Sequence, residues 1–87
     1  MKVVFHARFK KGYRKLKKNE QERFDSRLKI FLDNAFHPVL KNHPLHGRYN
    51  GCRSINIGGD LRAVYEIADN DTAYFLVLDT HSKLYSS

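Results

Sequence analysis

Residues 52–79, CRSINIGGDLRAVYEIADNDTAYFLVLD, decide the fold. Apolar and polar side chains alternate over residues 52–57 and again over residues 61–67, and Gly58-Gly59-Asp60 separates the two runs. Alternation with a period of two predicts half-buried strands, and a short glycine-rich break between such runs predicts a tight turn. This part of the chain therefore predicts a β-hairpin.

The alternation also sorts side chains onto the two faces of the predicted sheet. In the first strand, Arg53 shares a face with Ile55, while Asn56 lies on the other face. A second turn at residues 68–71 leads into a third strand over residues 72–79. Three strands joined by two tight turns predict an antiparallel meander.

The sequence before the strands is helical in pattern. Two prolines, each after a histidine, lie within residues 36–44, and the residue before a proline disfavours the helical region. This segment is therefore expected to connect a helical half to the strand half. Residues 2–8 predict a short strand, and residues 9–18 predict a short basic helix that Gly12 weakens.

Asn19 is expected to cap a second helix, with Glu20 and Glu22 in its first turn. Its apolar residues form one stripe, which we interpret as core packing: Phe24, Leu28, Phe31, Leu32 and Ala35. The two helices predict a hairpin packed on an antiparallel sheet. The predicted order is β-α-α-β-β-β, an α+β fold with a single domain over residues 1–87.

The charge is large and uneven. Sixteen Lys and Arg against nine Asp and Glu give +7, and residues 1–48 carry +9 while residues 49–87 carry −2. A basic half favours an anionic partner such as nucleic acid, the ribosome or an acidic protein; the alternative is a solvated face that only keeps the protein dispersed. No apolar run is long enough for a membrane span or a signal peptide, so a cytoplasmic location without a membrane partner is expected.

The sequence shows no clear metal site and no clear nucleophilic residue. His37, His43 and His46 lie close in sequence, but a structural zinc site needs about four ligands and only Cys52 is nearby. We therefore expect no metal and no small-molecule cofactor. Cys52 lies in an apolar strand, where a packed, inert thiol is expected, and a single cysteine agrees with a reducing compartment.

The remaining polar side chains suit the cleavage of RNA through its own 2′-hydroxyl. That reaction needs a base, an acid and cations around the phosphate, but no metal and no protein nucleophile. Each residue taken alone also fits a solvated surface position. The chain offers His43, His46, Asp60 and His81 for proton transfer, Arg48, Arg53, Arg62, Lys11 and Lys15 for phosphate binding, and Tyr49 and Tyr85 for base stacking.

Three separated motifs carry a resemblance: residues 41–57, KNHPLHGRYNGCRSINI; residues 60–65, DLRAVY; and residues 80–85, THSKLY. Together they are similar to toxins of the RelE/ParE superfamily, and most to its YafQ-like branch. The resemblance implies the β-α-α-β-β-β fold and a type II toxin that a cognate antitoxin neutralises. It also implies a ribosome-dependent endoribonuclease that cuts mRNA in the decoding site.

By matching position, the resemblance makes His81 the main general acid/base, with His43 and Asp60 assisting proton transfer or positioning the RNA. It implies that Arg53 contacts the phosphate and that Tyr85 stacks near the scissile nucleotides.

Four positions depart from the YafQ-like pattern. Asn56 stands where such enzymes can have a histidine, Leu61 replaces an aromatic residue, Val77 replaces an arginine, and Asp79 replaces a glycine. The lost arginine and the added acid make the pocket less attractive to phosphate, although Asp79 can instead orient His81. Two alternatives therefore stay open: a non-catalytic ParE-like toxin that inhibits DNA gyrase, and an attenuated toxin retained with its antitoxin.

Overall fold

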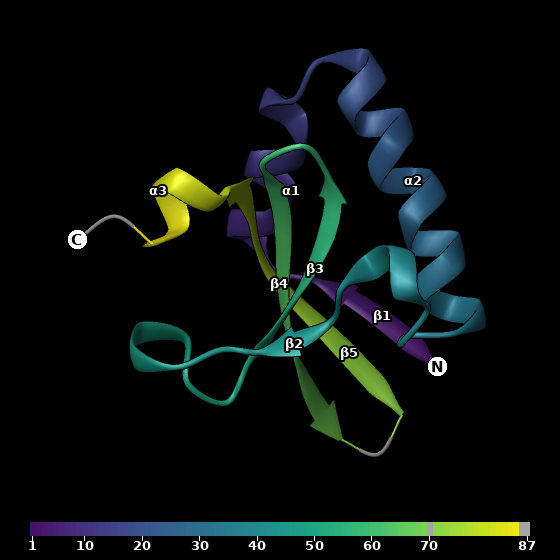
Figure 1. Ribbon diagram of the computed structural model, residues 1–87, viewed down its shortest axis with the longest axis vertical. Helices are drawn as coiled ribbons and strands as arrows, with labels where there is room; N and C mark the ends of the chain where they lie inside the picture. Colours follow the sequence, from purple (N-terminus) through teal and green to yellow (C-terminus); the bar gives the residue numbers. More distant parts are fainter. Residues whose placement is uncertain (70, 86–87) are drawn as a thin grey trace.

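The computed structural model describes residues 1–69 and 71–85 (Figure 1). Two single-turn helices, η1 (Pro38–Leu40) and η2 (Gly47–Tyr49), flank a short strand, β2 (His43–Pro44). The predicted β-α-α-β-β-β order is confirmed, with β2 and α3 as additions. The other helices and strands are β1 (Lys2–Phe5), α1 (Ala7–Lys15), α2 (Lys18–Asp33), β3 (Arg53–Gly58), β4 (Leu61–Asp69), β5 (Thr72–Thr80) and α3 (His81–Tyr85).

The five strands form one sheet in the order β1-β5-β4-β3-β2. Neighbouring strands pair antiparallel except β1 and β5, which run parallel. The expectation of a wholly antiparallel sheet is therefore wrong at this edge. The chain leaves β1 through two helices rather than through a tight turn, so β1 can lie beside the last strand in the parallel sense.

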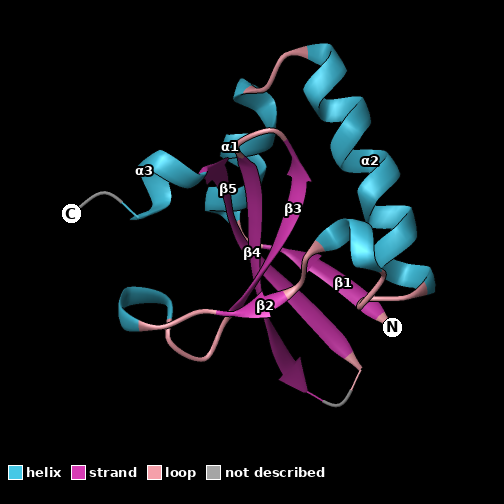
Figure 2. Cartoon of the chain, viewed as in Figure 1, coloured by secondary structure: helices cyan, strands magenta, loops and turns pink. Residues whose placement is uncertain are grey.

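The helical hairpin α1–α2 packs on one face of the sheet and encloses the larger core (Figure 2). Aromatic rings fill the centre of this core: the ring of Phe75 on β5 lies 5.6 Å from that of Phe9 and 5.4 Å from that of Phe31. A Cβ at Gly12 would lie 2.5 Å from the carbonyl oxygen of Leu78. Gly12 therefore allows the close approach of α1 to β5, beyond the helix weakening expected of it.

The first helix begins earlier than the sequence pattern predicts. β1 ends at Phe5 rather than at Arg8. The Nδ1 atom of His6 accepts a hydrogen bond from the backbone N–H of Arg8 at 3.1 Å and caps α1. A histidine cap that the pattern does not reveal thus ends the strand.

The second helix also begins earlier than predicted. α2 starts at Lys18, and the carboxylate of Glu20 accepts a hydrogen bond from the backbone N–H of Lys17 at 2.9 Å. Asn19 therefore lies inside the helix, and its predicted capping role is wrong, because Glu20 reaches back in the manner of a capping box. Leu32, assigned to the apolar stripe, is 47% exposed because α2 turns that side chain away from the sheet.

The turn at Gly58-Gly59-Asp60 is confirmed between β3 and β4. The flanking strands reach into the second predicted turn, since β4 extends to Asp69 and β5 begins at Thr72. Asn70, which belongs to that predicted turn, lies outside the described residues. The third predicted strand ends at Thr80 rather than at residue 79.

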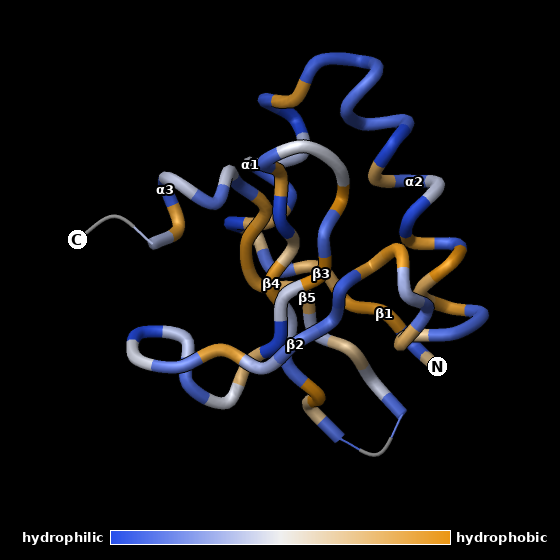
Figure 3. Tube along the Cα trace, in the orientation of Figure 1, coloured by the Kyte–Doolittle hydropathy of each residue, from blue (hydrophilic) through white to orange (hydrophobic). Residues whose placement is uncertain are grey.

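The opposite face of the sheet carries a smaller apolar cluster. Leu84 brings α3 onto this face, and the loop before β3 contributes Leu45 and Cys52. Hydrophobic segments follow the strands, whereas the junction of α1 and α2 is mainly hydrophilic (Figure 3). Within the described part of the chain, each helix is too short or too polar to cross a bilayer.

Candidate functional site

The end of the β4–β5 hairpin brings Asp60 and His81 together. β4 and β5 pair as far as Leu61 and Thr80, so the next residue on each side continues the ladder. The backbone N–H of His81 donates to the carbonyl oxygen of Asp60 at 2.7 Å. The hydroxyl of Ser82 donates to Oδ2 of Asp60 at 3.2 Å. Two predicted catalytic residues, distant in sequence, thus become neighbours through strand pairing.

Aromatic side chains line up beside His81. The imidazole ring of His81 lies 4.6 Å from the ring of Tyr85, one turn further along α3. The ring of Tyr85 meets that of Tyr49 edge to face at 6.4 Å, and the guanidinium of Arg48 lies 5.9 Å from the Tyr49 ring. Three elements of the prediction, His81, Tyr85 and Arg48, are therefore linked through one aromatic row.

Arg62 lies in the same region of the sheet. It faces Asn56 on β3 and Asp79 on β5, so the three side chains stand in one row on the α3 face. Nη1 of Arg62 donates to Oδ1 of Asn56 at 3.0 Å. The carboxylate of Asp79 instead accepts from the backbone N–H of Thr80 at 2.8 Å. Asp79 and Arg62 thus share a row without an ion pair between them in the described residues.

His43 lies on the α3 face but has its own local contact. It pairs with Ser54, which pairs in turn with Val64 on that face. Its Nδ1 atom lies 2.8 Å from the carbonyl oxygen of Lys41. Within residues 1–69 and 71–85, neither a hydrogen bond nor a ring contact joins His43 to His81. His43 therefore lies on the α3 face but does not contact Asp60 or His81.

Arg53 is separated from this group. It pairs with Tyr65, a residue of the helix-side core, and its Nε donates to Oδ1 of Asn42 at 2.7 Å. Its guanidinium lies 5.2 Å from the ring of Phe36, just beyond α2. The structure therefore places Arg53 on the helix face, opposite the face of His81.

The two predicted lysines lie on α1, and Lys15 lies nearer to the site. Lys15 and Lys83 both line a cavity of about 220 Å³ beside Thr80, at the end of β5. Lys11 is exposed on α1. The basic helix thus approaches the sheet end where His81 starts α3.

Two of the departures from the YafQ-like pattern are buried. Leu61 belongs to the helix-side core and Val77 to the smaller cluster under α3.

Burial, and then the charge of Glu66, raises the pKa of the Cys52 thiol, in agreement with the inert thiol that the sequence predicts. Among residues 1–69 and 71–85, no three His, Cys, Asp or Glu side chains gather in a way that could hold a metal ion.

Sequence reasoning missed Ser82 and the contact of Asn56 with Arg62. Ser82 directly follows His81 in the sequence, and this position is the only sequence feature that indicates a place for its hydroxyl in the site. The role of Asn56 had no local signal, because its partner lies across a hairpin.

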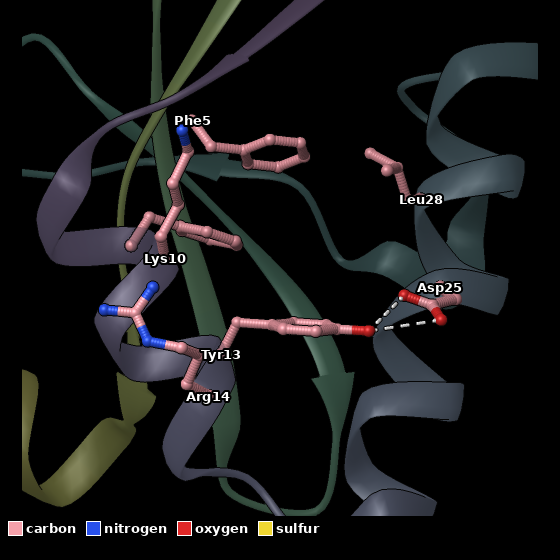
Figure 4. Close-up of a pocket in the computed structure, with 7 residues that line it drawn as sticks. Phe5, Lys10, Tyr13, Arg14, Asp25 and Leu28 are labelled. Carbon is pink, nitrogen blue, oxygen red and sulfur yellow. Dashed lines mark hydrogen bonds between the residues drawn. The ribbon is translucent and has the colours of Figure 1, made fainter.

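A separate groove of about 380 Å³ lies between α1 and α2 (Figure 4). The rings of Phe5 and Tyr13 reach from the α1 side towards α2. The Tyr13 hydroxyl donates to Asp25 at 3.0 Å. Desolvation, and then this hydrogen bond, raises the Tyr13 pKa. Lys10 and Arg14 also line the groove, but none of the predicted site residues does.

Comparisons with known proteins identify the family and the fold of the chain. The family model described as "Bacterial toxin of type II toxin-antitoxin system, YafQ" matches residues 1–86. YafQ from E. coli strain BL21(DE3) is similar in structure, with a TM-score of 0.80 and 19% identity, covering 97% of both chains. No curated protein matches the sequence.

Two solved complexes are also similar. The E. coli DinJ-YafQ complex gives a TM-score of 0.66 at 24% identity, with 97% of each chain covered. The Staphylococcus aureus YoeB-YefM complex gives 0.74 at 20% identity, covering 93% of this chain and 97% of the other. These likenesses establish the fold, and the family match establishes more: the chain belongs to the YafQ family of bacterial toxins of type II toxin-antitoxin systems.

Proposed function

We propose that this toxin is an endoribonuclease that cuts mRNA on the ribosome and thereby arrests translation. The observation that carries the proposal is the backbone hydrogen bond between Asp60 and His81, which brings the two residues together at an exposed end of the sheet. Arg62 lies two residues after Asp60, on β4, and the ring of Tyr85 lies beside the imidazole of His81 at a tilt. A proton-transfer pair, a cation and an aromatic ring are the groups that RNA cleavage without a protein nucleophile requires.

In the proposed reaction, a base removes the proton from a ribose 2′-hydroxyl, and that oxygen attacks the adjacent phosphorus. The bond from phosphorus to the 5′-oxygen breaks, and an acid protonates the leaving oxygen. The products are a 2′,3′-cyclic phosphate and a 5′-hydroxyl end. His81 is the main acid/base, while Asp60 and His43 assist proton transfer or position the RNA.

Phosphate binding falls to the cationic side chains around this centre. Arg62 binds the scissile phosphate, and Arg48 and Lys15 bind neighbouring phosphates. Lys11, further along α1, binds a phosphate beyond these. Tyr85 stacks on a base next to the cut. Arg53 lies on the other face, so a phosphate that it binds belongs to a different stretch of RNA from the one at His81.

The ribosome supplies what so small a domain lacks. The candidate site lies on an exposed sheet end, where His81, Asp60 and Tyr85 are all accessible. Cleavage demands that the 2′-hydroxyl, the phosphorus and the leaving oxygen be aligned, and orientation of this kind contributes much of the rate. An mRNA held in the decoding site arrives already oriented.

The test is 5′-end mapping of cellular mRNA after induction of the wild type and of His81→Ala. The wild type is expected to produce new 5′-hydroxyl ends within codons, and His81→Ala to lower them at least about 100-fold, the scale of general acid–base catalysis. Thermal melting checks that the variant folds. A fully toxic His81→Ala with gyrase-linked DNA damage contradicts the proposal, as does unimpaired growth on overexpression of the wild type.

We further propose that a cognate antitoxin with an acidic segment neutralises the toxin. In the similar solved complexes, YafQ is bound to DinJ and YoeB is bound to YefM. In this chain, the groove between α1 and α2 combines an aromatic lining with Lys10 and Arg14, neither of which forms an ion pair in the described residues. An acidic segment with an apolar side chain complements such a groove.

The partner proposal is tested by charge reversal. Lys10→Glu with Arg14→Glu is expected to weaken binding of the antitoxin. The antitoxin for this experiment is the product of the short reading frame expected beside this gene. The matched control reverses two exposed cations of α2, Lys18→Glu with Lys29→Glu. Equal weakening by both pairs, or binding that is insensitive to salt, contradicts the assignment of this groove.

A further inference from the structure

Asn56 on β3 holds the arginine of the candidate site. Asn56 and Arg62 face each other across the β3–β4 hairpin. The Oδ1 atom of Asn56 accepts hydrogen bonds from Nη1 of Arg62 at 3.0 Å and from the backbone N–H of Gly58 at 2.9 Å. One amide oxygen therefore ties the guanidinium to the start of the turn that carries Asp60.

The same nitrogen of Arg62 is fixed from two further directions. Nη1 also lies 2.9 Å from the carbonyl oxygen of Gly59 and 3.1 Å from that of Leu61. Nε and Nη2 make no hydrogen bond to the described residues. Because the guanidinium is planar and its five N–H groups form a rigid fork, fixing one edge also fixes the direction of the other.

The anchor itself brings no negative charge to Arg62. Asn56 is a neutral amide, and Asp79, the cross-strand neighbour on the other side, directs its carboxylate to the backbone N–H of Thr80. Arg62 forms no ion pair with the described residues. A carboxylate in place of the Asn56 amide would hold the same edge but would offset the charge that attracts a phosphate.

We propose that Asn56 is a positioning residue. It fixes Arg62 through Nη1 before RNA arrives and leaves the Nε–Nη2 edge directed to a phosphate beside Asp60 and His81. The proposal rests on the endoribonuclease function proposed above. An arginine that is already fixed loses little rotamer freedom when the phosphate binds, so the interaction is available in full for the reaction. The position where YafQ-like enzymes can have a histidine thus serves this chain as an anchor.

The first experiment measures the anchor without RNA. Backbone and Arg62 Nε–H order parameters are compared by NMR in the wild type, Asn56→Ala and Asn56→Asp. Arg62 is expected to be nearly as rigid as the backbone, with an order parameter of about 0.85, in the wild type and in Asn56→Asp. It is expected to be clearly more mobile in Asn56→Ala, where only the carbonyls of Gly59 and Leu61 still contact Nη1. The matched control is Asn19→Ala on exposed α2, which is expected to leave Arg62 unchanged. A mobile Arg62 in the wild type overturns the anchor.

The second experiment asks whether Asn56 acts through Arg62. Cleavage is measured as kcat/KM on ribosomes programmed with a short mRNA. Asn56→Ala is expected to lose about tenfold, and to lose no more than about twofold further in an Arg62→Gln background, because the anchor then has nothing to hold. Asn56→Asp is expected to raise KM while leaving Arg62 rigid. Losses by Asn56→Ala and Arg62→Gln that multiply overturn the positioning role.

The two experiments separate the failures. A wild type that cuts no RNA on programmed ribosomes overturns the proposed function, and with it the phosphate role of Arg62. A mobile Arg62 in a toxin that cuts RNA overturns the anchor alone. Melting temperatures of all variants exclude unfolding as the cause of any loss.

Discussion

Two asparagine–arginine pairs lie on opposite faces of the sheet, and they differ in what the asparagine joins. On the helix face, Asn42 accepts from Nε of Arg53 and donates through Nδ2 to the hydroxyl of Tyr65 at 2.8 Å. Tyr65 is buried in the larger core. This pair therefore fastens the connector before β2 to the main body of the domain.

On the α3 face, the asparagine joins its arginine to a turn instead. The side chain of Asn56 and the carbonyl of Gly59 both accept hydrogen bonds from Nη1 of Arg62. Gly59 directly precedes Asp60, whose carbonyl accepts from the backbone N–H of His81. The smaller apolar cluster lies on this face. The difference teaches that the helix face supplies most of the stability, while the α3 face holds exposed polar groups in fixed positions.

The largest expected effect is on the helix face. Phe75 is fully buried among the aromatic rings of the larger core, so Phe75→Ala is expected to lower the free energy of unfolding by about 3–5 kcal/mol. Urea denaturation measures the change. A loss below 1 kcal/mol would mean that the helix-side core is not the main source of stability.

A matched truncation on the α3 face is expected to separate stability from activity. Leu84→Ala removes the side chain that seats α3, at a cost of about 2 kcal/mol, the low end for such a truncation. Because α3 carries His81 and Tyr85, cleavage is expected to fall by more than the folded fraction does. Denaturation and programmed-ribosome cleavage on the same sample check this, and proportional losses would refute it.

Conservative changes of the two arginines sharpen the comparison. Arg62→Lys keeps the charge but loses the fork, and is expected to lower cleavage by about tenfold. Arg53→Lys loses the contact with Asn42 and the packing on Phe36, and is expected to lower the unfolding free energy by about 1 kcal/mol. Arg62→Lys should therefore cost more cleavage than Arg53→Lys, and the opposite order would reassign the phosphate contact.

The thiol of Cys52 predicts a pH effect on the smaller cluster. Burial raises the pKa of Cys52 in the folded state above the ordinary value of 9.0, so the unfolded chain loses the thiol proton first. The stability from this group is full below that value and is lost as the pH rises through the folded pKa. Denaturation between pH 8 and pH 10 should show the decline, and Cys52→Ala should reduce it.

The smallest expected effect concerns Asn19. Since Asn19 lies inside α2 and is exposed, Asn19→Ala is expected to change the unfolding free energy by no more than about 0.5 kcal/mol. A loss of about 1 kcal/mol would be the mark of a helix cap. Thermal melting of this variant therefore checks which residue begins the helix.

The strand half was predictable from sequence because its side chains alternate. The alternation placed Arg53 with Ile55 and placed Asn56 on the other face, as the structure shows. What alternation does not reveal is which face the helices cover. The resemblance implies a phosphate contact for Arg53, whereas the alternation of its own strand groups it with Ile55, a residue of the helix-side core.

Other features depend on contacts between distant residues. The parallel pairing of β1 with β5 and the meeting of Asp60 with His81 arise from the way strands assemble. The start of α2 depends on the reach of a glutamate side chain. Propensity alone favoured Asn19 there, since asparagine is a preferred cap.

The close approach at Gly12 has a consequence for genetics. Any larger side chain there meets the carbonyl oxygen of Leu78 and pushes α1 away from β5. Cells selected for survival under toxin expression will therefore collect substitutions at Gly12 as readily as at His81. A survivor's mutation identifies a residue that the toxin needs. Only the amount of folded toxin in that cell tells whether the mutation removed catalytic activity or lowered the amount of folded protein.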